Sequence, residues 1–375
     1  MKKKIRIYLF TTSRAEFALV NYLLHELRKN KIFITKLIVG GTHNLSNYGK
    51  TINEIKDQGH KIHKILKSFK SNDDPNSIVN YIKNDIGEIN NIFSKEKIDY
   101  VVIFGDRYET LSIVINSIMH QKKIIHLGGG EITEGVIDDQ VRNIITKAAY
   151  YHFPSSEFYK KRIINMGEDP VNVHNVGTLN VDVMKNIKDI SKKSKILEIL
   201  NLNYNDKFCL MTFHPANLES KFNSIQYLKN IFRVLDKYDL KIIITYPNLE
   251  IGSNKIIKFI KKKINKNSNY RFVKSLGYKR YNQLIKKSEF LIGNSSSGIY
   301  EAPYYRIPTI NLGDRQKGRL MHLSIINCNN SYEKIKKSVD MALSKKFKKK
   351  ISKMKYLFGN GSSSKKIVKI ISRLN

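Results

Sequence analysis

Residues 100–106, YVVIFGD, contain five consecutive apolar residues that stop at a glycine and an aspartate. A short run rich in β-branched and aromatic residues, closed by glycine, is typical of a buried strand in a parallel sheet. Residues 15–30 and 77–95 instead repeat apolar side chains every three or four positions, as helices with one buried face do. Similar apolar runs recur through the first half of the chain, at residues 5–12, 33–41, 123–130 and 150–156.

The same alternation starts again in the second half of the chain. A second set of apolar runs lies at residues 208–215, 241–248, 270–276, 289–296 and 308–313. Between the first two of these runs, residues 224–238 repeat apolar side chains with a helical period. Alternating strands and helices predict an α/β protein, and the restart predicts two Rossmann-like domains with parallel sheets around a cleft. The expected domains are residues 1–177 and 178–358, and residues 359–375 are expected to form a serine-capped helix placed to pack back on the first domain.

Composition limits the function classes that remain. The 375-residue chain carries 67 Lys and Arg against 32 Asp and Glu, a formal charge of +35. These basic residues are scattered, so solvated lysines and a patch for an anionic surface both stay open. No nucleic-acid-binding signature accompanies them, and no nucleic-acid partner is expected. No apolar segment reaches the ~20 residues that span a bilayer, and the N-terminus lacks a signal-peptide core, so we expect a cytoplasmic protein without membrane insertion.

The two cysteines, Cys209 and Cys328, provide neither a disulfide framework nor the spacing of metal ligands. The chain also lacks a P-loop, an HExxH zinc motif, a GxSxG nucleophile elbow and a convincing dinucleotide fingerprint. These motifs therefore give no indication of a metal or a cofactor.

Polar side chains gather where the apolar runs end. In an open α/β sheet, ligands bind beyond the carboxyl ends of the strands. The sequence meets this demand in both halves of the chain, and the two sets are expected to face each other across the cleft. The residues are Arg14, Asp106, Arg107, Glu131, His214, Asn248 and Ser295–Ser297.

Residues 291–303, LIGNSSSGIYEAP, predict an anion site in the second domain. A strand runs into three serines, and a helix is expected to follow with Glu301 one turn inside it. Amide groups at a helix start and serine hydroxyls suit phosphate, although ordinary N-capping by serine is the other interpretation. Glu301 is suited to accept hydrogen bonds from ribose, so a nucleotide diphosphate sugar is predicted. Arg315 would add a guanidinium for phosphate, unless its loop is only a basic surface segment.

Residues 126–143, HLGGGEITEGVIDDQVRN, concentrate carboxylates in an otherwise basic chain. Glu131 and Asp138 follow a glycine turn that brings backbone close to a ligand. With Asp106 they are candidates for proton transfer, and loop acidity is the alternative. If a helix begins at residue 138, Asp138 and Arg142 lie one turn apart on one face, and an i,i+4 ion pair between them is the alternative to a functional role.

Two further residues have two interpretations each. His214 follows a strand, where a histidine is either a structural hydrogen-bonding residue or a donor to phosphate and an acid for the leaving group. Arg14 forms either a salt bridge or a clamp on pyrophosphate.

The motifs, in this order, resemble those of the hydrolysing UDP-N-acetylglucosamine 2-epimerases of bacterial sialic and nonulosonic acid synthesis. The resemblance covers nearly the whole chain and implies a glycosyltransferase-B-like fold, a UDP-sugar substrate, no metal or redox cofactor, and a homo-oligomer, either a dimer or a tetramer. It rests on TTSRAEF, GGTHNLS, FGDRYETL, HLGGGEITEGVIDDQVRNIITKAAYYHF, FHPANLE, YPN, SLGY, GNSSSGIYEAP and NLGDRQKGR.

The resemblance also implies a reaction and roles for residues. UDP is eliminated to give a 2-acetamidoglucal, water adds at C1 and C2 is reprotonated on the other face, yielding N-acetylmannosamine and UDP. Asp106 and Asp138 match catalytic acids, with Glu131 and His214 as further catalytic candidates. The residues expected to bind substrate or UDP are Arg14, Arg107, Arg142, His214, Asn248, Ser295, Ser296, Glu301 and Arg315.

The chain departs from the family at one position. Where sialic-acid members usually read His-Ile-Glu-Gly-Gly-Glu, the first glutamate is Gly128 here. Either Glu131 or water replaces it, or the sugar differs, so UDP-2,4-diacetamido-2,4,6-trideoxyglucose, on the legionaminic acid route, stays open as a substrate. A glycosyltransferase using a UDP-sugar and an inactive sugar-nucleotide sensor are the alternatives from other classes.

Overall fold

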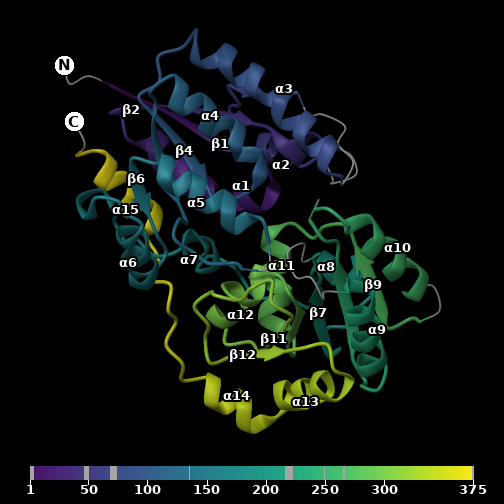
Figure 1. Cartoon of the computed structure of the whole chain (residues 1–375). Helices are drawn as coiled ribbons and strands as arrows, with labels where there is room; N and C mark the ends of the chain where they lie inside the picture. Colours follow the sequence, from purple (N-terminus) through teal and green to yellow (C-terminus); the bar gives the residue numbers. More distant parts are fainter. Residues whose placement is uncertain are drawn as a thin grey trace. The chain divides into compact units, whose positions relative to one another are not determined.

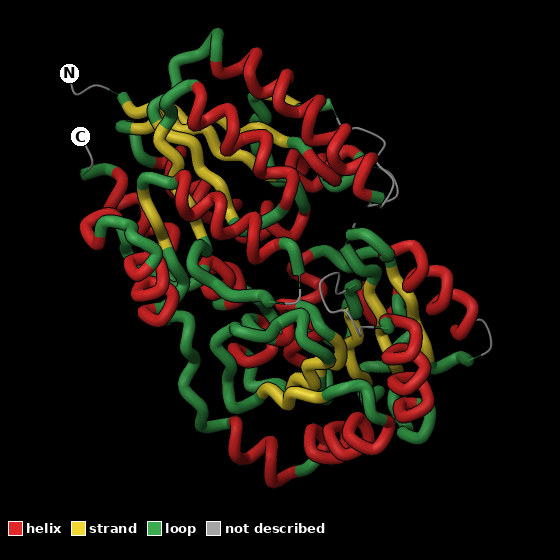
Figure 2. The backbone as a smooth tube through the Cα atoms, in the orientation of Figure 1, coloured by secondary structure: helices red, strands yellow, loops and turns green. Residues whose placement is uncertain are grey.

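The structure is a computed structural model that describes residues 4–45, 50–67, 74–134, 136–215, 223–248, 250–264 and 267–373. The chain divides into two compact units, each built on one parallel sheet with helices around it (Figures 1 and 2). Unit 1 comprises Met1–Glu131, Ile137–Lys185 and Phe358–Asn375, and unit 2 comprises Ile132–Val136 and Asn186–Leu357.

Unit 1 contains a six-stranded sheet in the order β3-β2-β1-β4-β5-β6, with every pairing parallel. The strand order reverses between β1 and β4. In such a sheet, the carboxyl ends of the two strands at the reversal form the usual ligand-binding edge. The strands are β1 (Ile5–Thr11), β2 (Phe33–Val39), β3 (Lys64–Ile65), β4 (Tyr100–Phe104), β5 (Lys123–Leu127) and β6 (Tyr151–Phe153).

The helices of unit 1 form two groups. One group packs α1 against α7 and α15, and the other packs α4 against α3 and α5. They are α1 (Arg14–Lys29), α2 (Ile52–Asp57), α3 (Pro75–Phe93), α4 (Leu111–Met119), α5 (Asp138–Ala148), α6 (Glu157–Asn165), α7 (Leu179–Met184) and α15 (Ser363–Ile371), with 3-10 turns η1 (Gly41–Asn44), η3 (Tyr108–Thr110) and η4 (Pro170–Asn172).

Unit 2 repeats this topology. Its sheet order, β12-β11-β10-β7-β8-β9, is the order of unit 1 read from the other edge, and it reverses between β7 and β10. Its strands are β7 (Phe208–Thr212), β8 (Lys241–Thr245), β9 (Tyr270–Val273), β10 (Leu291–Gly293), β11 (Thr309–Leu312) and β12 (Ile325–Cys328). Its helices are α8 (Lys195–Ile199), α9 (Ser224–Leu235), α10 (Ser253–Ile264), α11 (Tyr278–Lys287), α12 (Glu301–Tyr304), α13 (Tyr332–Leu343) and α14 (Lys345–Ile351), with a 3-10 turn η5 (Ser296–Gly298).

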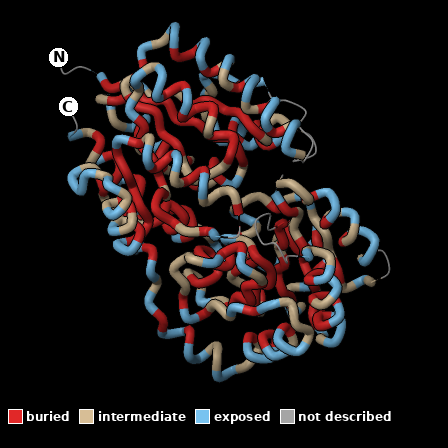
Figure 3. Tube along the Cα trace, viewed as in Figure 1, coloured by how far each residue is buried: buried red, intermediate tan, exposed pale blue. Residues whose placement is uncertain are grey.

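Burial on both faces explains why the central strands are continuously apolar (Figure 3). Along β7, Cys209 and Met211 pack into a core with helices α9, α10 and α13, whereas Phe208 and Leu210 pack into a second core with α8, α11 and α12. Successive side chains of a strand point to opposite faces, so both sets must be apolar when helices cover both faces. The predicted α/β class with two parallel sheets is confirmed.

The sequence prediction missed or misplaced a few elements. It missed the edge strands β3 and β12, because β3 is only two residues long and β12 is partly exposed. The serine cap predicted for the final helix is wrong: Ser362 makes no side-chain cap bond, and the Asp182 carboxylate of α7 instead accepts from the amides of Ser363 and Ser364 at 3.0 and 2.7 Å. The helix belongs to unit 1, where it packs against α1 and α7.

The described part of the chain lacks two features. None of its helices combines the length and the hydropathy of a membrane-spanning segment. No group of three His, Cys, Asp or Glu side chains within it is arranged to hold a metal ion.

Candidate active site

Asp106 lies just beyond β4, at the reversal of strand order in unit 1, and Arg142 of α5 holds it there. Arg142 donates to the Asp106 carboxylate through Nη2 and, at 3.0 Å, through Nε. Its Nη1 donates to the backbone oxygen of Glu131 at 2.8 Å and to Asp139 Oδ1 at 3.1 Å. The Arg142 side chain is only 1% exposed. One buried guanidinium therefore joins the end of β4, the glycine turn and the first turn of α5.

These contacts change the interpretation of Arg142. Within α5 its ion-pair partner is the i,i+3 neighbour Asp139, and a second partner, Asp106, comes from another element. The expected substrate contact by Arg142 remains a prediction, and the structure places its guanidinium against Asp106, Asp139 and the Glu131 backbone. Asp138 is the first residue of α5 and is partly buried.

The glycine turn allows its own backbone to fit closely between neighbours. Gly130 has φ 81°, and a Cβ atom there would lie 2.7 Å from the backbone oxygen of Tyr159. A Cβ atom on Gly129 would lie 2.8 Å from Nδ1 of His126. Gly128 also has a positive φ, 78°, but its added Cβ would meet nothing nearer than Phe104 at 3.9 Å. The first glycine is thus required by its backbone conformation, and the other two are required by space.

His126 supports this turn from within and was not among the predicted site residues. Its Nε2 contacts the backbone oxygen of Gly105 at 2.9 Å, and its Nδ1 contacts Thr146 Oγ1 at 3.3 Å. Burial lowers the pKa of His126 to about 4. A neutral histidine is therefore expected near pH 7, fixing the residue that precedes Asp106. The only sequence signal for it was a histidine placed among apolar residues of β5.

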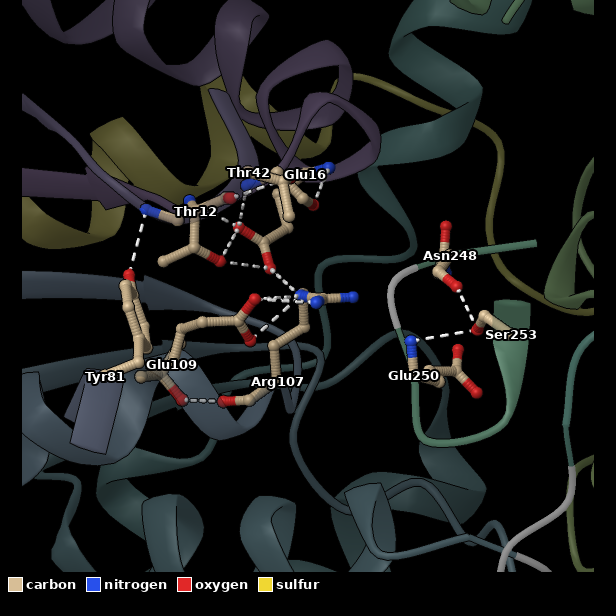
Figure 4. A network of polar contacts seen from close by, with 12 residues as sticks. Thr12, Glu16, Thr42, Tyr81, Arg107, Glu109, Asn248, Glu250 and Ser253 are labelled. Carbon is tan, nitrogen blue, oxygen red and sulfur yellow. Dashed lines mark hydrogen bonds and ion pairs between the residues drawn. The ribbon is translucent and has the colours of Figure 1, made fainter. Parts of the chain in front are cut away.

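Arg107 lies in an internal ion-pair network (Figure 4). It donates to Glu109 through Nη2 at 2.6 Å and through Nε at 3.1 Å, and its Nε lies 4.0 Å from Glu16 Oε1. Glu16 closes a capping box with Ser13 at the start of α1 and accepts from the Thr12 amide at 2.8 Å. Burial raises the pKa of Glu16 to about 7. The expected nucleotide contact by Arg107 remains a prediction, and the structure places its guanidinium against Glu109.

Arg14 is the first residue of α1, after the carboxyl end of β1. Burial lowers its pKa, and the charge of Glu54 opposes that shift. Glu131 is buried, and its Oε1 accepts from Ser155 Oγ at 3.4 Å. Both residues thus lie at the carboxyl edge of the unit 1 sheet, where they were predicted.

In unit 2, His214 and Asn294 join the two strands at the reversal of strand order. The His214 amide donates to Asn294 Oδ1 at 2.7 Å, and Asn294 Nδ2 donates to the His214 backbone oxygen at 2.9 Å. Gly293 permits the close approach of the strands, since a Cβ atom there would lie 2.0 Å from the Thr212 backbone oxygen. Asn294 was part of the quoted motif, but its role as a bridge to His214 was not predicted.

Glu250 contacts two of the predicted ligand-binding residues, Arg315 and His214. Its Oε1 accepts from Arg315 Nη2 at 2.9 Å and lies 3.7 Å from Nδ1 of His214. The Asn248 amide donates to the same Nδ1 at 3.2 Å, and Ser253 Oγ donates to the Asn248 backbone oxygen at 2.7 Å. Sequence reasoning missed Glu250, because it lies two residues beyond the polar residue that ends the β8 run.

The serine segment differs from its prediction. The expected helix with Glu301 one turn inside is wrong: Ser296–Gly298 form a 3-10 turn, and α12 begins only at Glu301 and has four residues. Ser296 is exposed, and Ser297 Oγ contacts Tyr281 OH at 2.9 Å. Glu301 is buried and accepts from Tyr278 OH at 3.4 Å. Pro303, which lacks an amide hydrogen, is the third residue of α12 and suits only a helix start.

Six of the predicted site residues form two contact groups, one within each unit. In unit 1, direct contacts join Asp106, Glu131 and Arg142. In unit 2, contacts through Asn294 and Glu250 join His214, Asn248 and Arg315. Each group lies at the carboxyl ends of the strands where its own sheet reverses order, which is the binding edge of such sheets.

Comparison with known proteins identifies the family of the chain. The family model described as UDP-N-acetylglucosamine 2-epimerase matches residues 25–372. The chain belongs to this family. It is therefore an enzyme of the UDP-sugar 2-epimerase class, as the motif resemblance indicated.

Individual relatives cover most of the chain. It is 35% identical to the GDP/UDP-N,N'-diacetylbacillosamine 2-epimerase (hydrolyzing) of Campylobacter jejuni, over 86% of this chain and 84% of that protein. It is 32% identical to the polysialic acid biosynthesis protein P7 of Escherichia coli, over 91% and 87%. A crystal structure of UDP-GlcNAc 2-epimerase from Neisseria meningitidis bound to UDP-GlcNAc has a TM-score of 0.83 at 17% identity, covering 98% of this chain and all of that one. This last likeness confirms the glycosyltransferase-B-like fold.

Proposed function

We propose that the protein is a hydrolysing 2-epimerase that converts UDP-N-acetylglucosamine to N-acetylmannosamine and UDP. The observation that carries the proposal is the buried guanidinium of Arg142, which holds the Asp106 carboxylate and the Glu131 backbone in one contact group. A reaction at a sugar C–H bond requires a base of fixed direction, because proton transfer needs hydrogen-bond reach and alignment. Family membership supplies the reaction class, and this contact group supplies candidate proton-transfer groups.

The reaction requires two opposed proton transfers. In the first half, a base takes the C2 proton while the C1–O bond to the β-phosphate breaks, and UDP leaves with that electron pair. In the second half, water adds its oxygen to C1 of the 2-acetamidoglucal, and a proton reaches C2 from the other face. We assign these transfers to the carboxylates Asp106, Asp138 and Glu131, with Arg142 holding Asp106 in place.

The departing diphosphate requires cationic support and hydrogen-bond donors. We assign that role to the unit 2 group, in which Arg315 provides charge and His214 provides a donor or an acid. Ser295 and Ser296 are the hydroxyl donors beside them, and Glu301 is the proposed acceptor for ribose. Ser295 is partly exposed and Ser296 is exposed, which supports contact with a ligand.

A second substrate is favoured by Gly128. A glutamate at this position would have to adopt a positive φ, which costs a residue with a side chain about 1–2 kcal/mol. With glycine at position 128, the chain has no carboxylate there. This absence suits a sugar with an extra acetamido group, which is the alternative substrate. The similarity to the Campylobacter jejuni protein named for diacetylbacillosamine supports UDP-2,4-diacetamido-2,4,6-trideoxyglucose as this second candidate.

Turnover in deuterated water tests the function. Each UDP-sugar is incubated with the protein, released UDP is quantified, and the sugar is examined by NMR spectroscopy. We expect UDP release with deuterium at C2 of a free sugar of inverted C2 configuration. Transfer of an undeuterated sugar to an acceptor would favour a glycosyltransferase, and binding without release would favour a sensor. The ratio of kcat/KM for the two UDP-sugars then decides the substrate.

A further inference from the structure

We propose that Glu250 is the positioning residue of the diphosphate site, holding Arg315 and His214 in the orientation in which they meet the anionic ligand. The proposal rests on the proposed function, because it takes a UDP-sugar diphosphate as the ligand. It adds a residue that neither the motifs nor the family resemblance pointed to.

Glu250 is part of a closed ring of contacts within unit 2. Its carboxylate accepts from Arg315 Nη2 at 2.9 Å, and Arg315 Nη1 donates to the Asn294 backbone oxygen at 3.3 Å. Asn294 in turn holds His214 at the end of β7. The ring returns through Asn248, whose amide donates to His214 Nδ1 at 3.2 Å.

The last link of the ring is Ser253, the first residue of α10. Its Oγ donates to the Asn248 backbone oxygen at 2.7 Å and accepts from the Glu250 amide at 3.0 Å. Ser253 is completely buried, so this turn is fixed to the body of unit 2. Glu250 is thereby held at both its backbone and its side chain.

The ring determines which hydrogen-bond donors of His214 and Arg315 are not used within it. Since His214 Nδ1 accepts from a backbone amide, the hydrogen of the neutral imidazole lies on Nε2, which becomes the donor. Arg315 is 8% exposed, and its buried Nε has no hydrogen-bond partner among the described residues. A buried guanidinium hydrogen without a partner is costly unless a ligand takes it up, and a diphosphate oxygen fits that need.

The carboxylate charge matters as well as its geometry. Glu250 Oε1 lies 2.9 Å from Nη2 of the cationic Arg315 and 3.7 Å from Nδ1 of His214. The three side chains are between 5% and 12% exposed, so water screens their interaction only weakly. An unpaired carboxylate here would repel a diphosphate, but one paired with the Arg315 guanidinium is neutralised and orients that cation instead.

The test compares substitutions at Glu250 in the full-length protein. Glu250→Ala removes the carboxylate, Glu250→Asp shortens it, and Glu250→Gln keeps an acceptor oxygen without the charge. UDP affinity is measured by titration calorimetry, and kcat and KM by UDP release. We expect Glu250→Ala to weaken UDP binding about tenfold or more, with a smaller loss for Glu250→Gln and partial rescue by Glu250→Asp. Glu333→Ala, at an exposed glutamate of α13, is the matched control and should leave affinity unchanged.

A double-mutant cycle with Arg315→Ala separates positioning from general damage. If Glu250 acts through Arg315, adding Glu250→Gln to Arg315→Ala causes little further loss of UDP affinity, whereas independent effects would add. Additive losses, or a folded Glu250→Ala variant within twofold of the wild type, overturn the proposal. If Glu250→Ala does not fold, the cycle with the isosteric Glu250→Gln decides. A wild-type protein that neither binds UDP nor releases it contradicts the proposed function instead.

Discussion

Arg142→Met removes the guanidinium that holds the proposed catalytic carboxylate, and its cost can be worked from the structure. The wild-type side chain makes charge-assisted hydrogen bonds to Asp106, Asp139 and the Glu131 backbone oxygen. Removing one partner of a buried ion pair costs about 3–5 kcal/mol, because the remaining charge loses its compensation. Asp106 and Asp139 are 22% and 21% exposed, so water can partly replace the lost partner. We therefore expect a loss at the lower end, about 3 kcal/mol in the free energy of unfolding.

The effect on catalysis should exceed that of simple destabilisation. Without Arg142, the Asp106 carboxylate can turn toward water, and a misplacement of about 1 Å at a reacting group can cost about hundredfold in rate. Arg142→Lys keeps a charge but cannot contact both carboxylates and the carbonyl with a planar fork, so an intermediate loss is expected. Urea denaturation followed by circular dichroism measures stability, and UDP release below the unfolding range measures kcat/KM.

Arg162→Met is the matched control. Arg162 also reaches the glycine turn, through contacts of 3.4 and 3.5 Å to the backbone oxygens of Gly130 and Glu131, but it is partly exposed, and its other contacts are to Asn143 and Met166. Arg162→Met should lower the free energy of unfolding less than Arg142→Met does, and it should lower kcat/KM far less. If Arg142→Met and Arg162→Met lost equal stability and equal rate, the reasoning that Arg142 fixes Asp106 would be refuted.

Three further predictions concern the same unit. Burial raises the pKa of Glu16 from 4.5 to about 7, so the folded state binds the extra proton and stability falls as pH rises between these values, by up to roughly 3 kcal/mol. Glu16→Gln should therefore gain melting temperature relative to the wild type between pH 5 and pH 8, and a constant difference would contradict this. Gly130→Ala should destabilise by about 2–4 kcal/mol through a positive φ and a backbone clash, whereas Gly128→Ala, with open space, should cost only the backbone strain; equal losses in thermal melts would count against the packing argument. Asp138→Asn should abolish UDP release while leaving the UDP dissociation constant nearly unchanged, and a full rate would remove it as an acid or base.

Local pattern was enough to place most of the predicted residues at the correct edge of each sheet. Asp106 follows β4 and His214 follows β7, because a strand ends where its apolar run stops, and polar residues at that point must lie at the carboxyl edge. Partners were harder to predict. For Arg142 the sequence offered a substrate contact or an i,i+4 ion pair along its helix, and it did not indicate Asp106, which lies 36 residues earlier in the chain.

Glu250 is a second case in which the sequence did not indicate the partner. Glu250 lies outside the YPN motif, two residues beyond Asn248, and only the turn fixed by Ser253 brings its carboxylate against Arg315, 65 residues later. The length of the serine-segment helix was misjudged for a related reason: the hydrogen bond between Tyr281 and Ser297 and the proline at position 303 shape the turn, and the first of these is a tertiary contact.

The sequence by itself determined most of the strands, the two-unit α/β class and the positions at which the predicted ligand-binding residues follow strands, because hydrophobic period and glycine content act locally. The tertiary structure alone decided which charged groups neutralise one another: Arg142 with Asp106, Arg107 with Glu109, and Arg315 with Glu250. Buried charges must find partners, and the partner available is set by which strand ends and helix starts the fold brings together in space.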